Sequence, residues 1–277
     1  MNSKASLTNE EFNLLRKLIA ENSGITLGDA KSYLVESRLR PLLKKSGCQT
    51  FMEFYQKARD RKTGWIDKII DAMTTNETLW FRDRSPFIIL KEAVLPALVQ
   101  TAKARKIRLW SAGCSTGQEP YSMAITIHEF CRANPNIKPM SFEILGTDIS
   151  PSALFTAISG RYEGLAISRG MDQSLLPRYF NKDGNTYSVN KEVKALVRFK
   201  QLNLQNSFTL LGKFDVIFCR NVAIYFSDEF KKTLFRKFYQ SLYPKGYFFL
   251  GSAENLRGLS DDFEPVQHKG SFYYRAK

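Results

Sequence analysis

Apolar residues near the start of the chain recur at helical spacing. Phe12, Leu15, Leu18 and Ile19 are spaced so that they would lie on one face of a helix. Thr8 and Glu11 form a capping-box pattern ahead of this run, and Gly24 stands where a helix of this length should end. The chain is therefore predicted to open with an amphipathic helix.

Helical patterns continue through the first part of the chain. Pro41 is predicted to kink or divide one of these helices, because proline lacks the amide hydrogen that an α-helix requires. Ser85 and Pro86 are predicted to be the N-cap and the first residue of a helix that runs to about Ala104. Other helices are expected over residues 29–46, 50–60 and 64–74. These patterns predict a small all-helical N-terminal domain over residues 1–84.

Strand-like and helix-like segments alternate from residue 107 onward. Strands are expected over 107–112, 142–148, 196–202, 214–219, 246–251 and 271–275, and helices over 118–132, from Pro151 and over 228–242. This alternation predicts an α/β domain over residues 85–277, with a mostly parallel sheet, helices on both faces and a ligand at the carboxyl ends of the strands. Between residues 161 and 195 the alternation lapses, and Asp183-Gly184 suits a hairpin turn. We expect an inserted small β-subdomain there.

The composition is typical of an ordered, soluble protein. Of the 277 residues, 43% are apolar and 13% aromatic, which is enough for a well-filled core. No window approaches the roughly 18 uninterrupted apolar residues of a membrane span, and the first residues lack the apolar core of a signal peptide. The four cysteines form no Cys-x-x-Cys pair, and there are only two histidines. We therefore expect reduced thiols, no metal and a cytoplasmic protein.

The chain carries an excess of positive charge. It has 41 Lys and Arg against 27 Asp and Glu, a formal net charge of +14. This balance indicates a polyanionic or acidic partner, and nucleic acid is the first candidate. The alternative is a solvated basic surface with no dedicated partner, and composition alone leaves both open.

The segment from Arg108 to Met123 is the most informative stretch of the sequence. A strand-like run breaks into a loop of small residues that contains Gly113 and Gly117, and a helical pattern follows. This order suggests a site for a nucleotide-type cofactor, because glycine lets the backbone approach a ligand closely. The Gly-x-x-x-Gly spacing differs from that of dinucleotide-binding folds, so a generic tight turn stays open as the alternative.

Polar residues follow three of the predicted strands. Asp148 ends the second strand, where an acid in such folds accepts hydrogen bonds from ribose hydroxyls; capping of the next helix is its alternative role. Asn203 and Leu204 follow the third strand, and Arg220 and Asn221 follow the fourth. Each pair alone could simply close a buried strand. Together they are predicted to face one site at the carboxyl edge of the sheet.

A polar and aromatic cluster from Thr74 to Asp83 lies between the two predicted domains. With it, six motifs follow one another as TTNETLWFRD, SAGCSTGQEPYSMA, ILGTDIS, FKQLNL, FDVIFCRNVAIYF and GYFFLGSAENL. In this order and spacing, over almost its whole length, the chain resembles the chemotaxis receptor glutamate methyltransferases, the CheR family. Departures are small: Trp80 stands where the family often has phenylalanine, and Ala223 occupies a position that is usually a larger apolar residue.

The resemblance implies an enzyme that uses S-adenosyl-L-methionine to esterify glutamate side chains of bacterial chemoreceptors, leaving S-adenosyl-L-homocysteine. The implied fold is a Rossmann-like S-adenosylmethionine-dependent methyltransferase domain with an inserted small β-subdomain, preceded by the all-helical domain. With Gly113 in the floor of the site, the cofactor-binding residues carried over by motif are Asn76, Thr78, Arg82, Glu119, Asp148, Asn203, Leu204, Arg220 and Asn221.

Arg82 and Tyr225 are the catalytic candidates. A sulfonium methyl group is already activated, and a glutamate with a pKa of about 4.3 is ionised at neutral pH, so no strong general base is required. The enzyme must align the carboxylate and exclude water. An arginine can hold a carboxylate by paired hydrogen bonds, and a tyrosine hydroxyl can orient an oxygen. The alternatives are that Arg82 binds the cofactor's own carboxylate and that Tyr225 is a core aromatic residue.

The resemblance also gives the basic surface a partner, the cytoplasmic domain of chemoreceptors. Positive groups on the second N-terminal helix, among them Arg38 and Arg40, are expected to bind and steer the substrate helices. In some family members the β-subdomain docks a receptor's C-terminal peptide. We expect a monomer that is recruited to receptor arrays, with no nucleic-acid partner and no insertion into the membrane.

Two other functions compete with this one. A nucleic-acid methyltransferase shares the fold, but enzymes that methylate base amino groups carry an Asn/Asp-Pro-Pro-aromatic motif after the fourth strand, where this chain has Cys-Arg-Asn-Val. A non-catalytic module could bind S-adenosylmethionine or dock receptors with the same fold. The intact catalytic and cofactor motifs argue against such a module.

Overall fold

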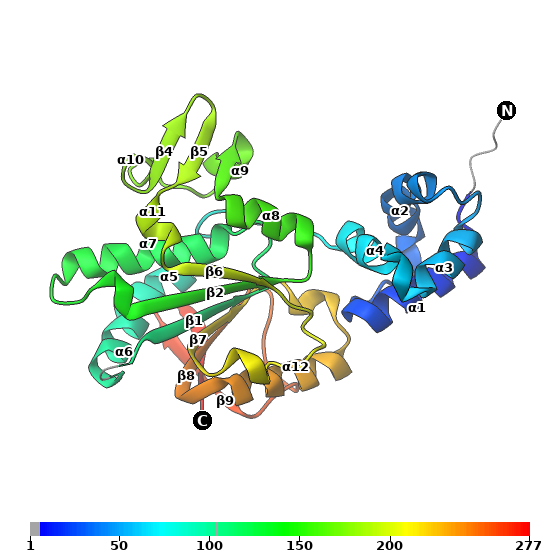
Figure 1. Cartoon of the computed structure of the whole chain (residues 1–277). Helices are drawn as coiled ribbons and strands as arrows, with labels where there is room; N and C mark the ends of the chain where they lie inside the picture. Colours follow the sequence, from blue (N-terminus) through cyan, green and yellow to red (C-terminus); the bar gives the residue numbers. More distant parts are fainter. Residues whose placement is uncertain (1–5, 103–104) are drawn as a thin grey trace.

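The structure, a computed structural model, describes residues 6–102 and 105–277. Four helices form the N-terminal part, which lies to the right in Figure 1 as a lobe of its own. They are α1 (Asn9–Ser23), α2 (Ser32–Ser46), α3 (Phe51–Arg59) and α4 (Trp65–Met73), with short 3₁₀ turns at Asp29–Lys31 and Arg61–Thr63. The predicted all-helical start of the chain is confirmed.

The ends of α1 follow its capping signals. The Thr8 hydroxyl accepts a hydrogen bond from the Glu11 amide at 3.2 Å, and the Glu11 carboxylate accepts one from the Thr8 amide at 2.9 Å. Gly24 ends the helix in the left-handed conformation, with φ 76°. Local sequence therefore sets the length of α1.

Helix α2 is not divided at Pro41 but runs unbroken to Ser46. Leu39 and Leu43 lie on either side of this proline, and both are buried in the core that Phe51 and Phe54 of α3 also fill. Burying two leucine side chains offsets the roughly 3 kcal/mol that proline costs inside a helix.

The segment after the helical lobe departs from the single helix that was predicted. It consists of α5 (Ser85–Ile89), a π-helical turn η3 (Leu90–Val94) and α6 (Leu95–Thr101). The predicted capping is wrong: Arg84 is the N-cap, with φ 50°, and Ser85 is already helical and makes no capping hydrogen bond. The first turn is closed by the backbone, through hydrogen bonds from the Phe87 and Ile88 amides to the Arg84 carbonyl, at 3.1 and 3.2 Å. The predicted end near Ala104 lies outside the described residues.

A seven-stranded sheet in the order β6-β2-β1-β7-β8-β10-β9 forms the centre of the second domain. The strands are β1 (Ile107–Ala112), β2 (Phe142–Asp148), β6 (Val197–Gln201), β7 (Phe214–Cys219), β8 (Leu242–Leu250), β9 (Phe263–His268) and β10 (Ser271–Ala276). Strands β6, β2, β1, β7 and β8 are parallel to one another, whereas β10 pairs antiparallel with both β8 and β9. The predicted α/β sheet is confirmed.

Successive residues of the central strands point to opposite faces of the sheet. Leu109 and Val216 pack on one face with α7 (Gln118–Ala133), and Trp110 and Ile217 pack on the other face with α12 (Asp228–Ser241). Figure 1 shows these two helices on opposite sides of the sheet. The carboxyl ends of the strands are thereby left as the open edge.

The last strands were only partly predicted. Strand β8 begins at Leu242, four residues before the predicted start at 246, and β9 was not predicted at all. Strand β9 carries Pro265 and lies at the outer edge of the sheet, where half-buried and exposed positions alternate after the buried Phe263. Proline is tolerated there because an edge strand leaves its amides unpaired on one side.

A second sheet, in the order β3-β5-β4, rises from the domain at the top left of Figure 1. Its strands are β3 (Arg161–Glu163), β4 (Phe180–Asp183) and β5 (Thr186–Val189). The short helices around it are α8 (Pro151–Ser159), α9 (Leu165–Ser168), α10 (Leu176–Tyr179) and α11 (Lys191–Lys194). Asp183 and Gly184 lie at the turn between β4 and β5, as predicted.

The helical lobe meets the sheet domain at the carboxyl edge of the strands. Ile25, just after α1, forms an isolated antiparallel bridge with Phe226, which follows β7. The Asp71 carboxylate of α4 accepts hydrogen bonds from the hydroxyls of Ser150, at 2.5 Å, and Ser152, at 2.9 Å, where α8 begins. A negative charge is favourable at a helix N-terminus. The lobe therefore closes the open edge of the sheet.

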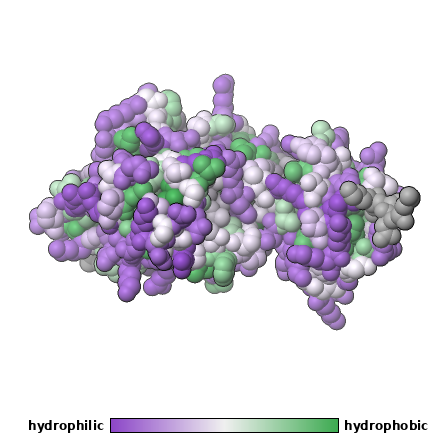
Figure 2. Space-filling view, turned by 90° about the horizontal axis from the view of Figure 1, so that it is seen from above, coloured by the Kyte–Doolittle hydropathy of each residue, from purple (hydrophilic) through white to green (hydrophobic). Residues whose placement is uncertain are grey.

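The face seen from above in Figure 2 is covered mostly by hydrophilic residues, with separate hydrophobic spots between them. Within residues 6–102 and 105–277, no helix is long and apolar enough to cross a membrane.

Candidate functional site

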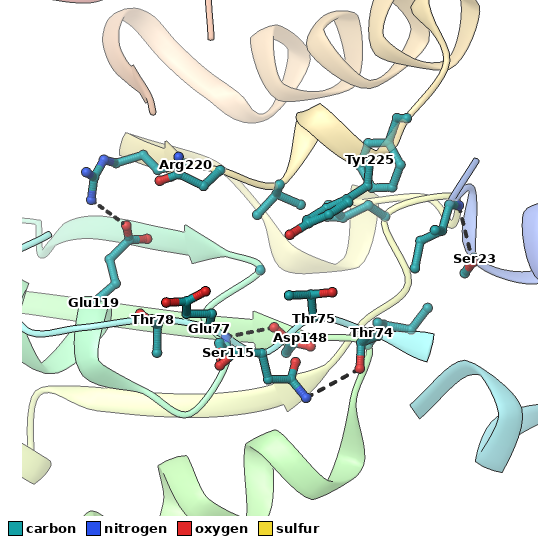
Figure 3. Close-up of a pocket in the computed structure, with 18 of the residues that line it drawn as sticks. Ser23, Thr74, Thr75, Glu77, Thr78, Ser115, Glu119, Asp148, Arg220 and Tyr225 are labelled. Atoms are coloured by element: carbon teal, nitrogen blue, oxygen red, sulfur yellow. Dashed lines mark hydrogen bonds and ion pairs between the residues drawn. The ribbon is translucent and has the colours of Figure 1, made fainter. Parts of the chain in front are cut away.

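A pocket of about 950 Å³, counted out to its open mouth, lies between the helical lobe and the carboxyl edge of the sheet. Figure 3 shows the side chains that converge on it from both domains and from the segment between them. Apart from Arg38 and Arg40, it is lined by every predicted site residue: Asn76, Thr78, Arg82, Gly113, Glu119, Asp148, Asn203, Leu204, Arg220, Asn221 and Tyr225.

The loop after β1 forms one wall of the pocket. The amides of Gly113 and Cys114 both donate to the Thr147 carbonyl, at 2.8 and 2.9 Å, and so fasten the loop to β2. Gly113 has φ 79°, and a Cβ atom there would lie 2.4 Å from Val222 Cγ2. Only glycine allows this approach. The loop is therefore both a tight turn and a wall of the pocket.

Asp148 lies at the bottom of the pocket. Its carboxylate accepts hydrogen bonds from the Ser115 amide at 2.7 Å and from the Ser150 amide at 2.9 Å. The helix that follows is capped by Ser150, whose hydroxyl accepts from the Ala153 amide at 3.0 Å. The capping role that was the alternative for Asp148 therefore falls to Ser150. Carboxylate oxygens have further lone pairs, so Asp148 can still accept bonds from ribose hydroxyls.

Burial raises the pKa of Asp148, and hydrogen bonds from the backbone amides of Ser150, Ser115 and Ile149 oppose that effect only in part. Because the ionised form is the better acceptor, we expect affinity for S-adenosylhomocysteine to be highest where Asp148 is ionised. It should fall as the pH drops through this raised pKa, above the range of an exposed aspartate. Calorimetric titrations from about pH 4 to about pH 8 will measure this.

Asp148→Asn is the control for that titration, because asparagine does not ionise. The variant should bind weakly, and its affinity should lose the pH dependence that Asp148 causes. Burial also raises the pKa of Glu119, which lines the same pocket and will contribute to the dependence left in the variant. Identical pH profiles for the wild type and the variant would contradict the assignment.

Glu119 and Arg220 form a buried ion pair in the wall of the pocket, visible at the left of Figure 3. Arg220 Nη1 donates to the Glu119 carboxylate at 3.0 Å, and the other carboxylate oxygen accepts from the Ser111 hydroxyl at 2.7 Å. The Arg220 side chain is completely buried, and its Nε has no hydrogen-bond partner among the described residues. A buried donor without a partner is costly, and an acceptor group in the pocket would satisfy it.

The segment from Phe81 to Arg84 is strained. Phe81, Asp83 and Arg84 have positive φ values of 48°, 65° and 50° although none of them is glycine. Arg220 Nη2 donates at 2.7 Å to both the Arg82 carbonyl and the Asp83 carboxylate. The buried arginine therefore holds this strained backbone against the wall formed by Glu119.

The Arg82 side chain lines the pocket and has little else to bind. Its single hydrogen bond within the described chain is a long one, from Nη1 to the Glu77 carbonyl at 3.4 Å. Its guanidinium group is therefore available for a carboxylate. The two carboxylates that it could bind are that of the cofactor and that of the substrate.

Residues 74–83, between the helical lobe and the sheet domain, form the junction segment, and Asn76 fixes its position by hydrogen bonds. Its amide group donates to the hydroxyls of Thr74 and Ser150, at 3.3 Å each. Its carbonyl accepts a hydrogen bond from the Ser115 hydroxyl at 2.9 Å. The junction segment and the loop after β1 therefore form two walls that touch at this residue.

The helical lobe supplies the remaining wall. Asn203 donates through Nδ2 to the Asn22 carbonyl at 2.7 Å, and the Tyr225 carbonyl accepts from the Thr26 amide at 2.9 Å. In Figure 3 the Tyr225 hydroxyl points into the cavity. Tyr225 also packs against the core under α12, so the two roles predicted for it are compatible.

Arg38 and Arg40 lie outside this pocket. Arg38 donates to the Thr74 carbonyl at 2.9 Å and to the Thr75 hydroxyl at 3.2 Å, which ties α2 to the junction segment. Arg40 is paired with Glu36 on the same helix. Contact of these two arginines with the substrate stays a prediction.

Several lining residues were not predicted. Ser23 and Ile25 reach the pocket only because Ile25 pairs with Phe226, a contact between distant parts of the chain that no local motif indicates. Glu254 lies just behind the lining: its carboxylate accepts from the Asn221 amide at 2.6 Å. It holds Asn221 at φ 58°. Its place in the sixth motif was the signal that could have identified it.

The lining fits S-adenosylmethionine, which has a carboxylate, a ribose and an adenine ring with apolar faces. Arg82 and the unpartnered Nε of Arg220 suit the carboxylate, Asp148 suits the ribose, and Leu204 and Val222 provide apolar surface. Within the described residues, no group of three or more His, Cys, Asp or Glu could hold a metal ion.

Comparison with known proteins supports a CheR methyltransferase over both domains. Residues 10–74 match the family described as "CheR methyltransferase, all-alpha domain", and residues 76–272 match "CheR methyltransferase, SAM binding domain". The cofactor of the second domain is therefore S-adenosylmethionine.

Curated relatives match along their whole length. "Chemotaxis protein methyltransferase 1" of Pseudomonas aeruginosa is 42% identical over 273 residues, which cover 98% of this chain and 100% of that one. "Chemotaxis protein methyltransferase Cher2" of Pseudomonas putida is 42% identical over 274 residues, with the same coverage. "Chemotaxis protein methyltransferase" of Borreliella burgdorferi is 37% identical, covering 93% of this chain and 92% of its own. This chain belongs to the CheR methyltransferase family.

Proposed function

We propose that this protein transfers the methyl group of S-adenosylmethionine to glutamate side chains of bacterial chemoreceptors, as a protein-glutamate O-methyltransferase. The main observation behind this proposal is the lining of the pocket. Arg82 lies in it with a guanidinium group that makes only one long hydrogen bond, and the Tyr225 hydroxyl points inward. The names of the relatives, chemotaxis protein methyltransferases, support this substrate.

The reaction requires little of the protein beyond the correct positioning of the substrate carboxylate and the methyl group. When bound, S-adenosylmethionine supplies an activated methyl group, which an ionised carboxylate can accept without losing a proton. In this proposal, Arg82 holds the carboxylate, Tyr225 orients its attacking oxygen, and the helical lobe excludes water. Neither histidine lines the pocket: His128 contacts the Glu192 carbonyl, and His268 pairs with Glu92. A reaction without a general base is consistent with that arrangement.

Incubation with methyl-labelled S-adenosylmethionine tests the proposal. Receptor-containing membranes should acquire label that mild base releases as volatile methanol, because methyl esters hydrolyse and methylated amines do not. RNA and DNA offered in parallel should stay unlabelled. Retained binding of S-adenosylhomocysteine without any base-labile label would instead favour a non-catalytic docking module.

We also propose that the basic face of α2 receives the receptor, in the cytoplasm and at receptor arrays. The exposed Lys44 and Lys45 lie near the end of this helix. Replacing both with alanine should raise the KM for the receptor severalfold at low salt and flatten its salt dependence, while affinity for S-adenosylhomocysteine stays unchanged. Steady-state kinetics across a salt series will measure this.

Arg38→Ala provides the comparison for the lysine variant. Because Arg38 also holds Thr74 and Thr75, its loss should weaken cofactor binding as well as receptor binding. Unchanged receptor kinetics in the lysine variant would count against α2 as the docking face.

A further inference from the structure

The β-subdomain is attached to the junction segment through Trp80. This side chain is fully buried, and its Nε1 donates to the Ala166 carbonyl, in α9, at 2.8 Å. Its ring packs edge-to-face against Tyr162 of β3, with 5.0 Å between ring centroids, and against Phe180 of β4, at 5.1 Å. Trp80 lies between Thr78 and Arg82, which both line the pocket. The pocket wall and the subdomain therefore share one side chain.

The backbone is joined at the same place. The Trp80 amide donates to the Arg169 carbonyl at 3.2 Å. Gly170 has φ 81°, and a Cβ atom there would lie 2.0 Å from the Trp80 carbonyl oxygen. Arg169 also pairs with Glu77 at 3.1 Å. The junction segment is thus packed on the subdomain too closely for the two to move independently.

A second contact reaches the loop after β1, which forms the adjoining wall of the pocket. The Tyr162 hydroxyl donates at 2.7 Å to the Thr116 carbonyl, in the loop between Gly113 and Gly117. Burial raises the pKa of this phenol well above its ordinary value, so it remains a hydrogen-bond donor at neutral pH. Trp80 and Tyr162, which touch each other, therefore brace both walls.

We propose that the β-subdomain is a structural part of the cofactor site, in which Trp80 and Tyr162 are positioning residues that set the spacing of the two walls. Neither residue is among those that line the pocket, so they act through the backbone of the junction segment and of the glycine loop. This inference rests on S-adenosylmethionine as the cofactor and goes beyond the proposed function, because it concerns how the site is built.

Tyr162→Phe in the full-length protein is the test, because it removes one hydroxyl and leaves the ring packing. The dissociation constant for S-adenosylhomocysteine and the KM for S-adenosylmethionine should both rise about five- to tenfold, with kcat changed less than about twofold. Tyr187→Phe is the matched control. Tyr187 faces Tyr162 across the β3–β5 pair, and the described residues offer its hydroxyl no hydrogen bond. The control should retain wild-type values.

Trp80→Phe extends the test to the wall formed by the junction segment. It should raise the same dissociation constant, and the double variant should lose less affinity than the product of the two single effects, because the residues act as one brace. A Tyr162→Phe protein that binds as tightly as the control, or that loses kcat with unchanged affinity, would overturn the inference. Absence of binding in the wild type would instead reject the cofactor assignment on which the proposed function rests.

Discussion

Replacing Arg220 with alanine is expected to abolish methyl transfer and to lower the free energy of unfolding by about 3–5 kcal/mol. The side chain is completely buried and holds Glu119, the Asp83 carboxylate and the Arg82 carbonyl. Its loss leaves a buried carboxylate without its partner and releases the strained segment that carries Arg82. Denaturant unfolding and calorimetry with S-adenosylhomocysteine will measure the two effects.

Arg105→Ala separates lost stability from lost function. Arg105 makes two hydrogen bonds, at 2.6 and 2.8 Å, to the buried Asp215, and neither residue lines the pocket. We expect this variant to lose about 2–3 kcal/mol of stability while its affinity for S-adenosylhomocysteine stays at the wild-type value. Wild-type activity in Arg220→Ala would show that the ion pair does not organise the site.

Arg82→Ala should lower kcat/KM for methyl transfer about 100-fold, because paired charge-assisted hydrogen bonds to a carboxylate stabilise it by roughly 3 kcal/mol. Stability should change by less than about 1 kcal/mol, since this side chain is partly exposed and makes one long contact. Steady-state kinetics with receptor membranes will measure the loss.

The binding of S-adenosylhomocysteine to Arg82→Ala identifies the carboxylate that this arginine holds. Weakened binding assigns Arg82 to the cofactor, whereas unchanged binding with a raised receptor KM assigns it to the substrate glutamate. Tyr225→Phe is the companion variant: it should reduce kcat and leave cofactor affinity unchanged. A fully active Arg82→Ala enzyme would contradict both assignments.

The parts of the site that the sequence could predict are those whose position follows from the residues next to them in the chain. The loop with Gly113 lies between a strand and a helix, and Asp148 is the last residue of a strand. The rule that ligands bind at the carboxyl ends of parallel strands was therefore enough to bring them together. Arg220 and Asn221 were placed by the same rule. Their roles were carried over from the resemblance, and the variants described above test them.

The parts that sequence could not predict depend on contacts between distant segments. The sequence indicates that Arg38 is an exposed basic residue of α2, yet its guanidinium donates to the carbonyl of Met73, the last residue of α4. Whether Tyr162 faces the glycine loop is decided by how the β-subdomain folds back, which no local pattern encodes. The strained conformation of Asp83 is held by Arg220, which lies more than a hundred residues further along the chain.

Mass spectrometry of receptor peptides is the most direct test of methyl transfer to chemoreceptor glutamates. Purified protein is incubated with S-adenosylmethionine and receptor cytoplasmic domains, and the peptides are sequenced before and after mild base. We predict added methyl groups on glutamate side chains, removed by base and missing when the Arg220→Ala protein is used. Base-stable methylation on other side chains, or no methylation by a protein that binds S-adenosylhomocysteine, would contradict the account.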